Sequence, residues 1–173
     1  MILPAGLRKL ALTAHVTASV GWLGAVVAFL GLAIVGLTSE HPATVRGVYL
    51  VMEPVAWFVL VPLALASLLT GIVQSLGTAW GLFRHYWVVF KVLIAVIATA
   101  VLLIYLRTFR TMAAMAAAPG TDLDVVRNAS PLLHAVLALL VLLVATVLAV
   151  YKPPGLTRYG WRKRREERSR SKW

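Results

Sequence analysis

The stretch PLLHAVLALLVLLVATVLAVY, residues 131–151, decides the fold because it contains no formally charged residue. A helix needs about 20 mainly apolar residues to cross the hydrocarbon core of a bilayer, which is about 30 Å thick. A cation, two prolines and a glycine follow directly, as Lys152, Pro153, Pro154 and Gly155, and residues of these kinds end helices. The stretch therefore predicts one membrane-spanning helix with a defined end.

Three further apolar stretches precede it. No charged residue occurs between Lys9 and Glu40 or between Glu53 and Arg84, and each of these gaps is long enough for one span. The third stretch is interrupted only by Lys91. The sequence therefore predicts an all-α polytopic membrane protein, a bundle of four transmembrane helices, at about 10–37, 55–78, 86–107 and 131–151.

The composition excludes most soluble classes of protein. Of the 173 residues, 61% are hydrophobic and only 13% are charged, with a mean hydropathy of +0.87, whereas average globular chains carry about 25% charged residues. The absence of cysteine excludes disulfide scaffolds, zinc fingers and iron–sulfur clusters. We expect a single four-helix transmembrane domain over residues 1–151, followed by a basic cytoplasmic tail over residues 152–173.

The distribution of basic residues predicts the orientation. Residues 152–173 hold nine basic residues against Glu166 and Glu167. With Arg8, Lys9 and Arg84 they put twelve basic residues on one side of the membrane, and only four fall on the other. Basic residues stay cytoplasmic, so both termini are predicted inside a multi-pass protein of the cell membrane. The tail is expected to meet anionic lipid headgroups, and we expect no nucleic-acid partner.

The second predicted span carries two packing signals. Ser67, Gly71 and Ser75 are spaced by four, and small residues at this spacing let helix backbones approach closely in lipid. Pro62 removes one backbone donor from the middle of the same span and should bend it. We therefore expect a bent helix whose small-residue stripe faces another helix.

Ionisable residues inside spans are candidate functional residues because they are costly to insert. His15 and Lys91 enter their helices from the cytoplasmic side to a similar depth, so they could meet inside the bundle. Each also has a purely structural interpretation: Lys91 could extend its ammonium to the interface, and His15 could be a hydrogen-bonded core residue. His85 lies in an aromatic cluster at residues 80–87 typical of the membrane interface, and it could also supply a second ligand.

A second group of candidate ligands falls on the outer side. His134 begins the fourth span there, about one apolar layer away from His15, so the two cannot share one metal. With His41, Glu53 and the thioethers of Met52, Met112 and Met115, it offers an alternative copper-type site. The alanine-rich run from Met112 to Ala118 is expected to be a short separate helix on the outer surface.

Two stretches carry a resemblance to known families: His15-Val-Thr-Ala-Ser-Val-Gly-Trp-Leu-Gly-Ala25 and Trp87-Val-Val-Phe-Lys91-Val-Leu-Ile. The chain resembles an uncharacterised family of predicted integral membrane proteins frequent in actinobacteria, over nearly its whole length. It is also distantly similar to the copper-resistance D proteins and to the haem-containing membrane protoporphyrinogen oxidase. His15, Trp22, Gly24 and Lys91 are the residues that match these two groups.

The resemblance implies a b-type haem with His15 as axial ligand. Lys91 would then neutralise a haem propionate, since an intramembrane cation usually finds a partner. One interpretation is therefore a haem-binding, redox-linked membrane protein. The other is a non-enzymatic protein that moves copper or serves as an accessory or scaffold subunit. Whether the protein is an enzyme, and whether it is a homo-oligomer or part of a larger membrane complex, stays open from the sequence.

Overall fold

The computed structural model describes residues 3–78 and 81–170, and these residues are almost entirely helical. Trp80 of the aromatic cluster and the last three residues of the basic tail lie outside the described residues. The helices are α1 (Ala5–Thr38), α2 (Pro42–Val55), α3 (Val61–Leu76), α4 (Tyr86–Ala117), α5 (Leu123–Val126), α6 (Ser130–Tyr151) and α7 (Arg158–Arg170), with a π-helical turn, η1 (Ala56–Leu60), between α2 and α3.

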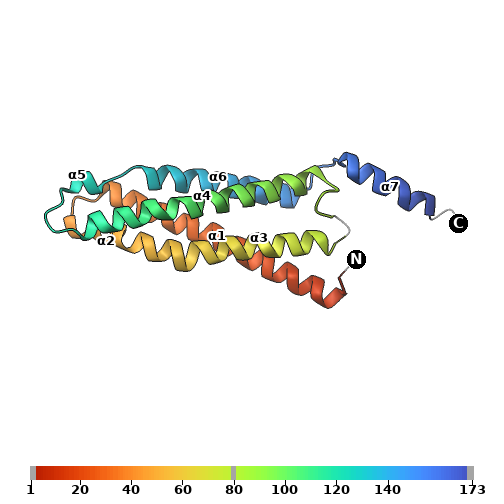
Figure 1. The fold of residues 1–173 in the computed structure, drawn as a ribbon, viewed down its shortest axis with the longest axis horizontal. Helices are drawn as coiled ribbons and strands as arrows, with labels where there is room; N and C mark the ends of the chain where they lie inside the picture. Colours follow the sequence, from red (N-terminus) through yellow and green to blue (C-terminus); the bar gives the residue numbers. More distant parts are fainter. Residues whose placement is uncertain (1–2, 79–80, 171–173) are drawn as a thin grey trace.

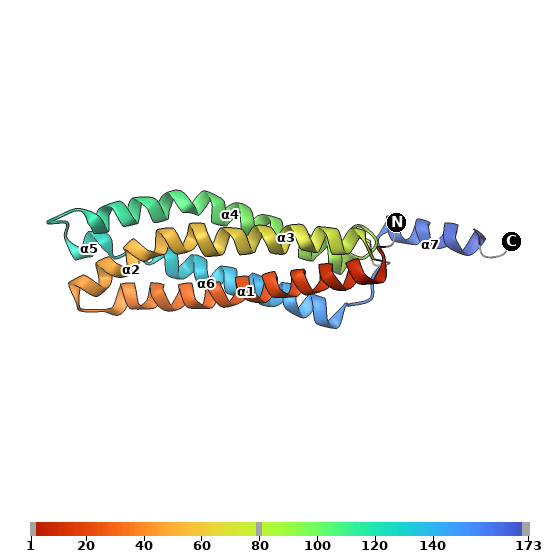
Figure 2. The same ribbon diagram turned by 90° about the horizontal axis from the view of Figure 1, so that it is seen from below.

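Four long helices lie side by side as an elongated bundle (Figures 1 and 2). The first is α1, the second is the continuous helix Pro42–Leu76 formed by α2, η1 and α3, and the others are α4 and α6. All four are long and apolar enough to cross a membrane, which confirms the predicted four-span, all-α fold. Both termini lie at one end of the bundle, here called the terminal end, and α5 lies at the opposite loop end (Figure 1).

Three of the predicted helix boundaries are wrong by more than one turn, and the first of them is the start of α1, at Ala5 instead of near residue 10. The second span begins at Pro42 instead of near residue 55, and the third continues to Ala117 instead of ending near residue 107. The run from Met112 to Ala118 is therefore the last part of α4 and is not a separate surface helix. The reason is packing: buried Tyr49 of α2 and buried Met112 of α4 belong to one apolar core, which holds both segments helical beyond the charge-free stretches.

The irregularity predicted from Pro62 takes the form of the π-helical turn. The amide of Val61 donates to the carbonyl of Ala56, five residues earlier, directly before the proline. Pro62 has no amide hydrogen with which to continue the α-helical pattern, and prolines and π-bulges are both features at which helices depart from regular α-helical geometry. The second span thus changes its helical register near its middle.

Large side chains fill the loop half of the bundle. Phe29 of α1 contacts Phe109 of α4 with ring centroids 5.0 Å apart, and Tyr105 meets Phe109 edge-on at 4.8 Å. At the end of this core, the guanidinium of Arg46 donates to the carbonyls of Ala116 and of two residues in the following connection, 118 and 121. The loop end is therefore densely packed and tied together.

Candidate functional site

A cavity of about 510 Å³ lies in the terminal half of the bundle, between all four spans. We call it the central cavity. Its wall is mainly apolar and includes Trp22, Val88 and Leu142, one from each of three helices. Its polar lining includes His15, Ser19, Gln74, Ser75, Lys91 and Lys152. An apolar wall with a few polar groups is the usual composition of a small-molecule site.

His15 is held in the wall of this cavity by a hydrogen bond that fixes its tautomer. Its Nδ1 lies 3.1 Å from the backbone oxygen of Ser67 and 3.3 Å from the hydroxyl oxygen of Thr70. A carbonyl oxygen only accepts, so Nδ1 carries the proton and donates. In the neutral ring, Nε2 then keeps its lone pair and is the nitrogen able to bind a metal.

The predicted small-residue stripe faces α1, as expected. The hydroxyl oxygens of Ser19 and Ser67 lie 2.8 Å apart across the two helices. Gly71 lies against the His15 ring so closely that a Cβ atom added there would be 3.0 Å from Cε1 of the histidine. The stripe therefore lets α3 approach α1 and sets the position of the imidazole.

Lys91 lines the same cavity and points its ammonium toward the terminal end. Its Nζ lies 5.7 Å from the ring centroid of Trp87, one turn nearer the start of α4. This direction agrees with the interfacial interpretation, and the cation–π contact keeps the charge beside the cavity. Lys152 lines the cavity from the end of α6, and no acidic residue is among the described residues that line it. The central cavity is therefore positively charged near its terminal end.

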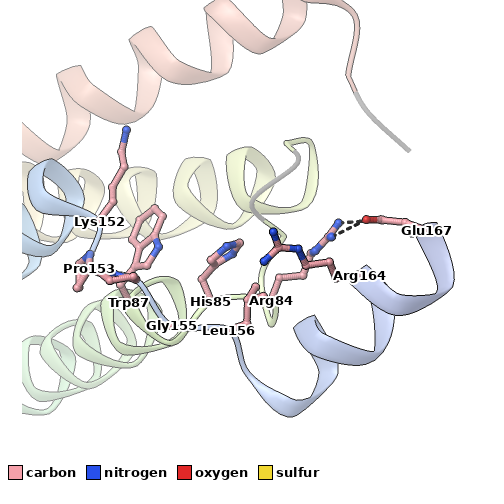
Figure 3. A pocket seen from close by; sticks show the side chains of 10 residues that line it. Arg84, His85, Trp87, Lys152, Pro153, Gly155, Leu156, Arg164 and Glu167 are labelled. Carbon is pink, nitrogen blue, oxygen red and sulfur yellow. Dashed lines mark hydrogen bonds and ion pairs between the residues drawn. The ribbon is translucent and has the colours of Figure 1, made fainter. Parts of the chain in front are cut away.

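His85 is not brought together with His15. It lies at the start of α4 in a neighbouring space of about 440 Å³, the terminal pocket, formed with the α6–α7 connection and with α7 (Figure 3). Trp87 and Lys152 line both the terminal pocket and the central cavity. The structure therefore places His85 beside the haem site that the sequence predicts and not inside it.

The outer-side candidates lie apart from this region. His134 donates from Nδ1 to the backbone oxygen of Ser130, 2.8 Å away, and its ring stacks on Tyr105 with centroids 4.0 Å apart. Glu53 lies half-buried in α2. Within residues 3–78 and 81–170, no three His, Asp or Glu side chains gather into a metal-sized group. The part of the alternative copper-type site that depends on imidazole and carboxylate ligands therefore has no group of three such side chains in these residues.

Comparison with known proteins assigns no function, so any functional argument depends on the geometry of the site. Protein-family models, curated proteins and solved structures gave no match. The family resemblance therefore stays a prediction. The sequence interpretation missed several polar lining residues, among them Gln74 and Lys152. The sequence does contain a signal for Lys152. This residue directly follows the fourth predicted span, so it lies at the same membrane level as the start of the third predicted span.

Proposed function

We propose that this protein binds haem b in the central cavity as a redox-linked protein of the cytoplasmic membrane, with both termini inside the cell. The observation that carries the proposal is the hydrogen bond from His15 Nδ1 to the Ser67 carbonyl, at 3.1 Å. Histidines that bind metals nearly always donate their other ring nitrogen to a carbonyl or carboxylate. His15 has this arrangement on the wall of a ligand-sized cavity, and it is assigned as the axial ligand.

The remaining lining residues fit the other parts of this cofactor. The macrocycle is apolar and aromatic, and Trp22 and Leu142 offer a matching surface. The propionates are anionic, and Lys91 and Lys152 both line the cavity as cations. Haem would supply one-electron chemistry, tuned by its axial ligand and by the surrounding dielectric. His15 is the one histidine among the described lining residues, so the proposal assigns a single protein ligand to the iron.

The test is the absorption spectrum of detergent-purified protein after expression with ample haem. We expect a Soret band that His15→Ala abolishes, because the substitution removes the ligand nitrogen. His134→Ala is the matched control: it removes another intramembrane histidine that also donates to a carbonyl, but at the loop end. We expect this control to keep the band. Colourless wild-type protein, or an unchanged spectrum for His15→Ala, would contradict the proposal.

In that event the non-enzymatic interpretation would take over, with the protein as a copper-transport-like or accessory membrane subunit. His15 would then serve only to join α1 to α3 through its bond to the Ser67 carbonyl. A copper role would need ligands that converge, and His134 and Glu53 belong to no group of three His, Asp or Glu side chains in the described part of the chain. The haem proposal is therefore the better supported of the two.

A further inference from the structure

The central cavity opens sideways between α1 and α6. Three of its lining residues are also exposed on the outside of the bundle: Val16 is 49% exposed, Val20 63% and Val150 70%. The lining residues that α3 and α4 contribute are all buried or half-buried. Both views of the fold show α1 and α6 diverging toward the terminal end (Figures 1 and 2). We call this opening the side mouth, with Val16, Val20 and Val150 as its rim.

The side mouth lies at the depth of the lipid chains. Val16 and Val20 lie seven and eleven residues after Lys9, the last charged residue before the apolar part of α1. These separations correspond to about 10 and 16 Å along a helix, and one leaflet of the hydrocarbon core is about 15 Å deep. The three rim side chains are aliphatic. A molecule that passes through the side mouth therefore comes from the hydrocarbon of the adjacent leaflet.

The same cavity offers hydrogen-bonding groups to the polar part of such a molecule. Gln74 is half-buried in the lining, and none of the described residues forms a hydrogen bond with its carboxamide. A carboxamide can both donate and accept. Ser75 lines the cavity beside it and donates its own proton to the carbonyl of Gly71, so its oxygen still has lone pairs with which to accept.

The positions of these groups define how the molecule is oriented. Gln74 lies three residues beyond Gly71, the residue in contact with His15, and is therefore nearer the terminal end of the bundle. The rim residues Val16 and Val20 follow His15 along α1 and extend deeper into the leaflet. A polar head at Gln74 and an apolar chain in the side mouth would thus have the orientation of the surrounding lipids.

We propose that the central cavity takes up, through the side mouth, a neutral amphiphile dissolved in the membrane. Its head carries carbonyl or hydroxyl oxygens and binds at Gln74 and Ser75, which are uncharged hydrogen-bonding groups, and its apolar chain lies between α1 and α6. The inference goes beyond the proposed function, because neither these two residues nor the rim is assigned to haem. It can also be tested in protein that lacks haem.

The experiment is photolabelling of the purified full chain in an uncharged detergent. The probe is a monoacylglycerol with a diazirine in its chain, and mass spectrometry of peptides locates the labelled residues. We expect label at Val16 and Val20 that an excess of unlabelled monoacylglycerol removes. Val27 and Val144 are the matched control positions, since they are 50% and 51% exposed on α1 and α6 and do not line the cavity. Label at these two positions should persist, because contact with bulk amphiphile does not saturate.

Two variants test the head contact. Gln74→Leu removes the carboxamide at similar size, and we expect it to weaken the saturable labelling by about threefold to tenfold, the effect of one lost hydrogen bond. Thr17→Val is the matched control, because Thr17 is exposed on α1 at the depth of Val16 and does not line the cavity. It should leave the labelling unchanged.

A third variant, His15→Ala, separates this proposal from the haem proposal. It removes the proposed iron ligand, and we expect labelling of the rim to persist. Loss of that labelling in His15→Ala would overturn the independent binding of the amphiphile, whatever the absorption spectrum of the wild-type protein.

The competitors identify the head and complete the test. Competition by a decyl-substituted benzoquinone as strong as that by monoacylglycerol supports a quinone head, and competition by monoacylglycerol alone supports a glyceride head. Equal competition by phosphatidylcholine would overturn the proposal, because the rim would then only contact lipid in general. Rim labelling that is absent, that does not saturate, or that is equally strong in Gln74→Leu would overturn it as well.

Discussion

Gly71→Ala tests the contact on which the position of His15 depends. A Cβ atom at this position would lie 3.0 Å from Cε1 of the imidazole, whereas carbon atoms in contact prefer about 3.5–4.0 Å. The ring must therefore move away from α3 by about 0.5–1 Å. Because Ser67 lies on the same helix as Gly71, this movement also lengthens the 3.1 Å bond from Nδ1 to the Ser67 carbonyl.

These terms give the expected size of the effect. Overpacking of this kind costs about 1–3 kcal/mol, and a hydrogen bond between spans contributes about 0.6 kcal/mol on average. Replacing glycine with alanine inside a helix returns about 0.5–1 kcal/mol. We therefore expect Gly71→Ala to lower the free energy of unfolding by about 1–2 kcal/mol. Gly24→Ala is the matched control, since nothing lies within 4 Å of its added Cβ, and it should be neutral or stabilising.

The assay is equilibrium unfolding in mixed micelles with a rising fraction of dodecyl sulfate, followed by circular dichroism. The difference between the two variants carries the information, because it removes the helix-propensity term that both share. If Gly71→Ala proves as stable as Gly24→Ala, the close contact between α3 and His15 does not exist as described. The small-residue stripe would then not set the position of His15, and this conclusion would hold whether or not the protein shows the absorption spectrum of haem.

Two other predictions follow from the backbone and from the charge distribution. Lys152 has a φ of 45°, a left-handed conformation that favours glycine. Lys152→Gly should therefore raise the free energy of unfolding by about 1 kcal/mol, whereas Lys152→Ala should not. The same micelle titration measures both variants. Reporter fusions at Thr121 and at the C-terminus should report opposite sides of the membrane, with the C-terminus cytoplasmic. Equal accessibility of both fusions from outside would exclude the predicted orientation.

The number of spans could be predicted from the sequence because charge-free stretches of sufficient length are a one-dimensional property. The ends of the spans could not, because they depend on contacts between distant segments. Arg46 and Glu53 mark residues 42–55 as a connection by charge alone. In the structure Arg46 donates to carbonyls at the end of α4, so its charge is accommodated and the helix extends over this segment.

The depth of the candidate residues along their helices could be predicted from the sequence. The rotation of each helix about its own axis, which decides what these residues contact, could not. Counting residues along each helix places His15 and Lys91 at the same level, and both line the central cavity. The bond from His15 to the Ser67 carbonyl depends on how α1 and α3 are turned toward each other, which no spacing in a single helix reveals. The position of His85 differs from the prediction for a similar reason. Its backbone pairs with Leu156, more than 70 residues later, and this pairing places His85 in the terminal pocket.

The contrast between the two halves of the bundle has a consequence for traffic through the molecule. Phe29, Phe109 and Met112 are each at most 4% exposed and fill the loop half, while the central cavity occupies the terminal half alone. Movement of a molecule from the central cavity to the loop end of the bundle would therefore require these packed side chains to separate.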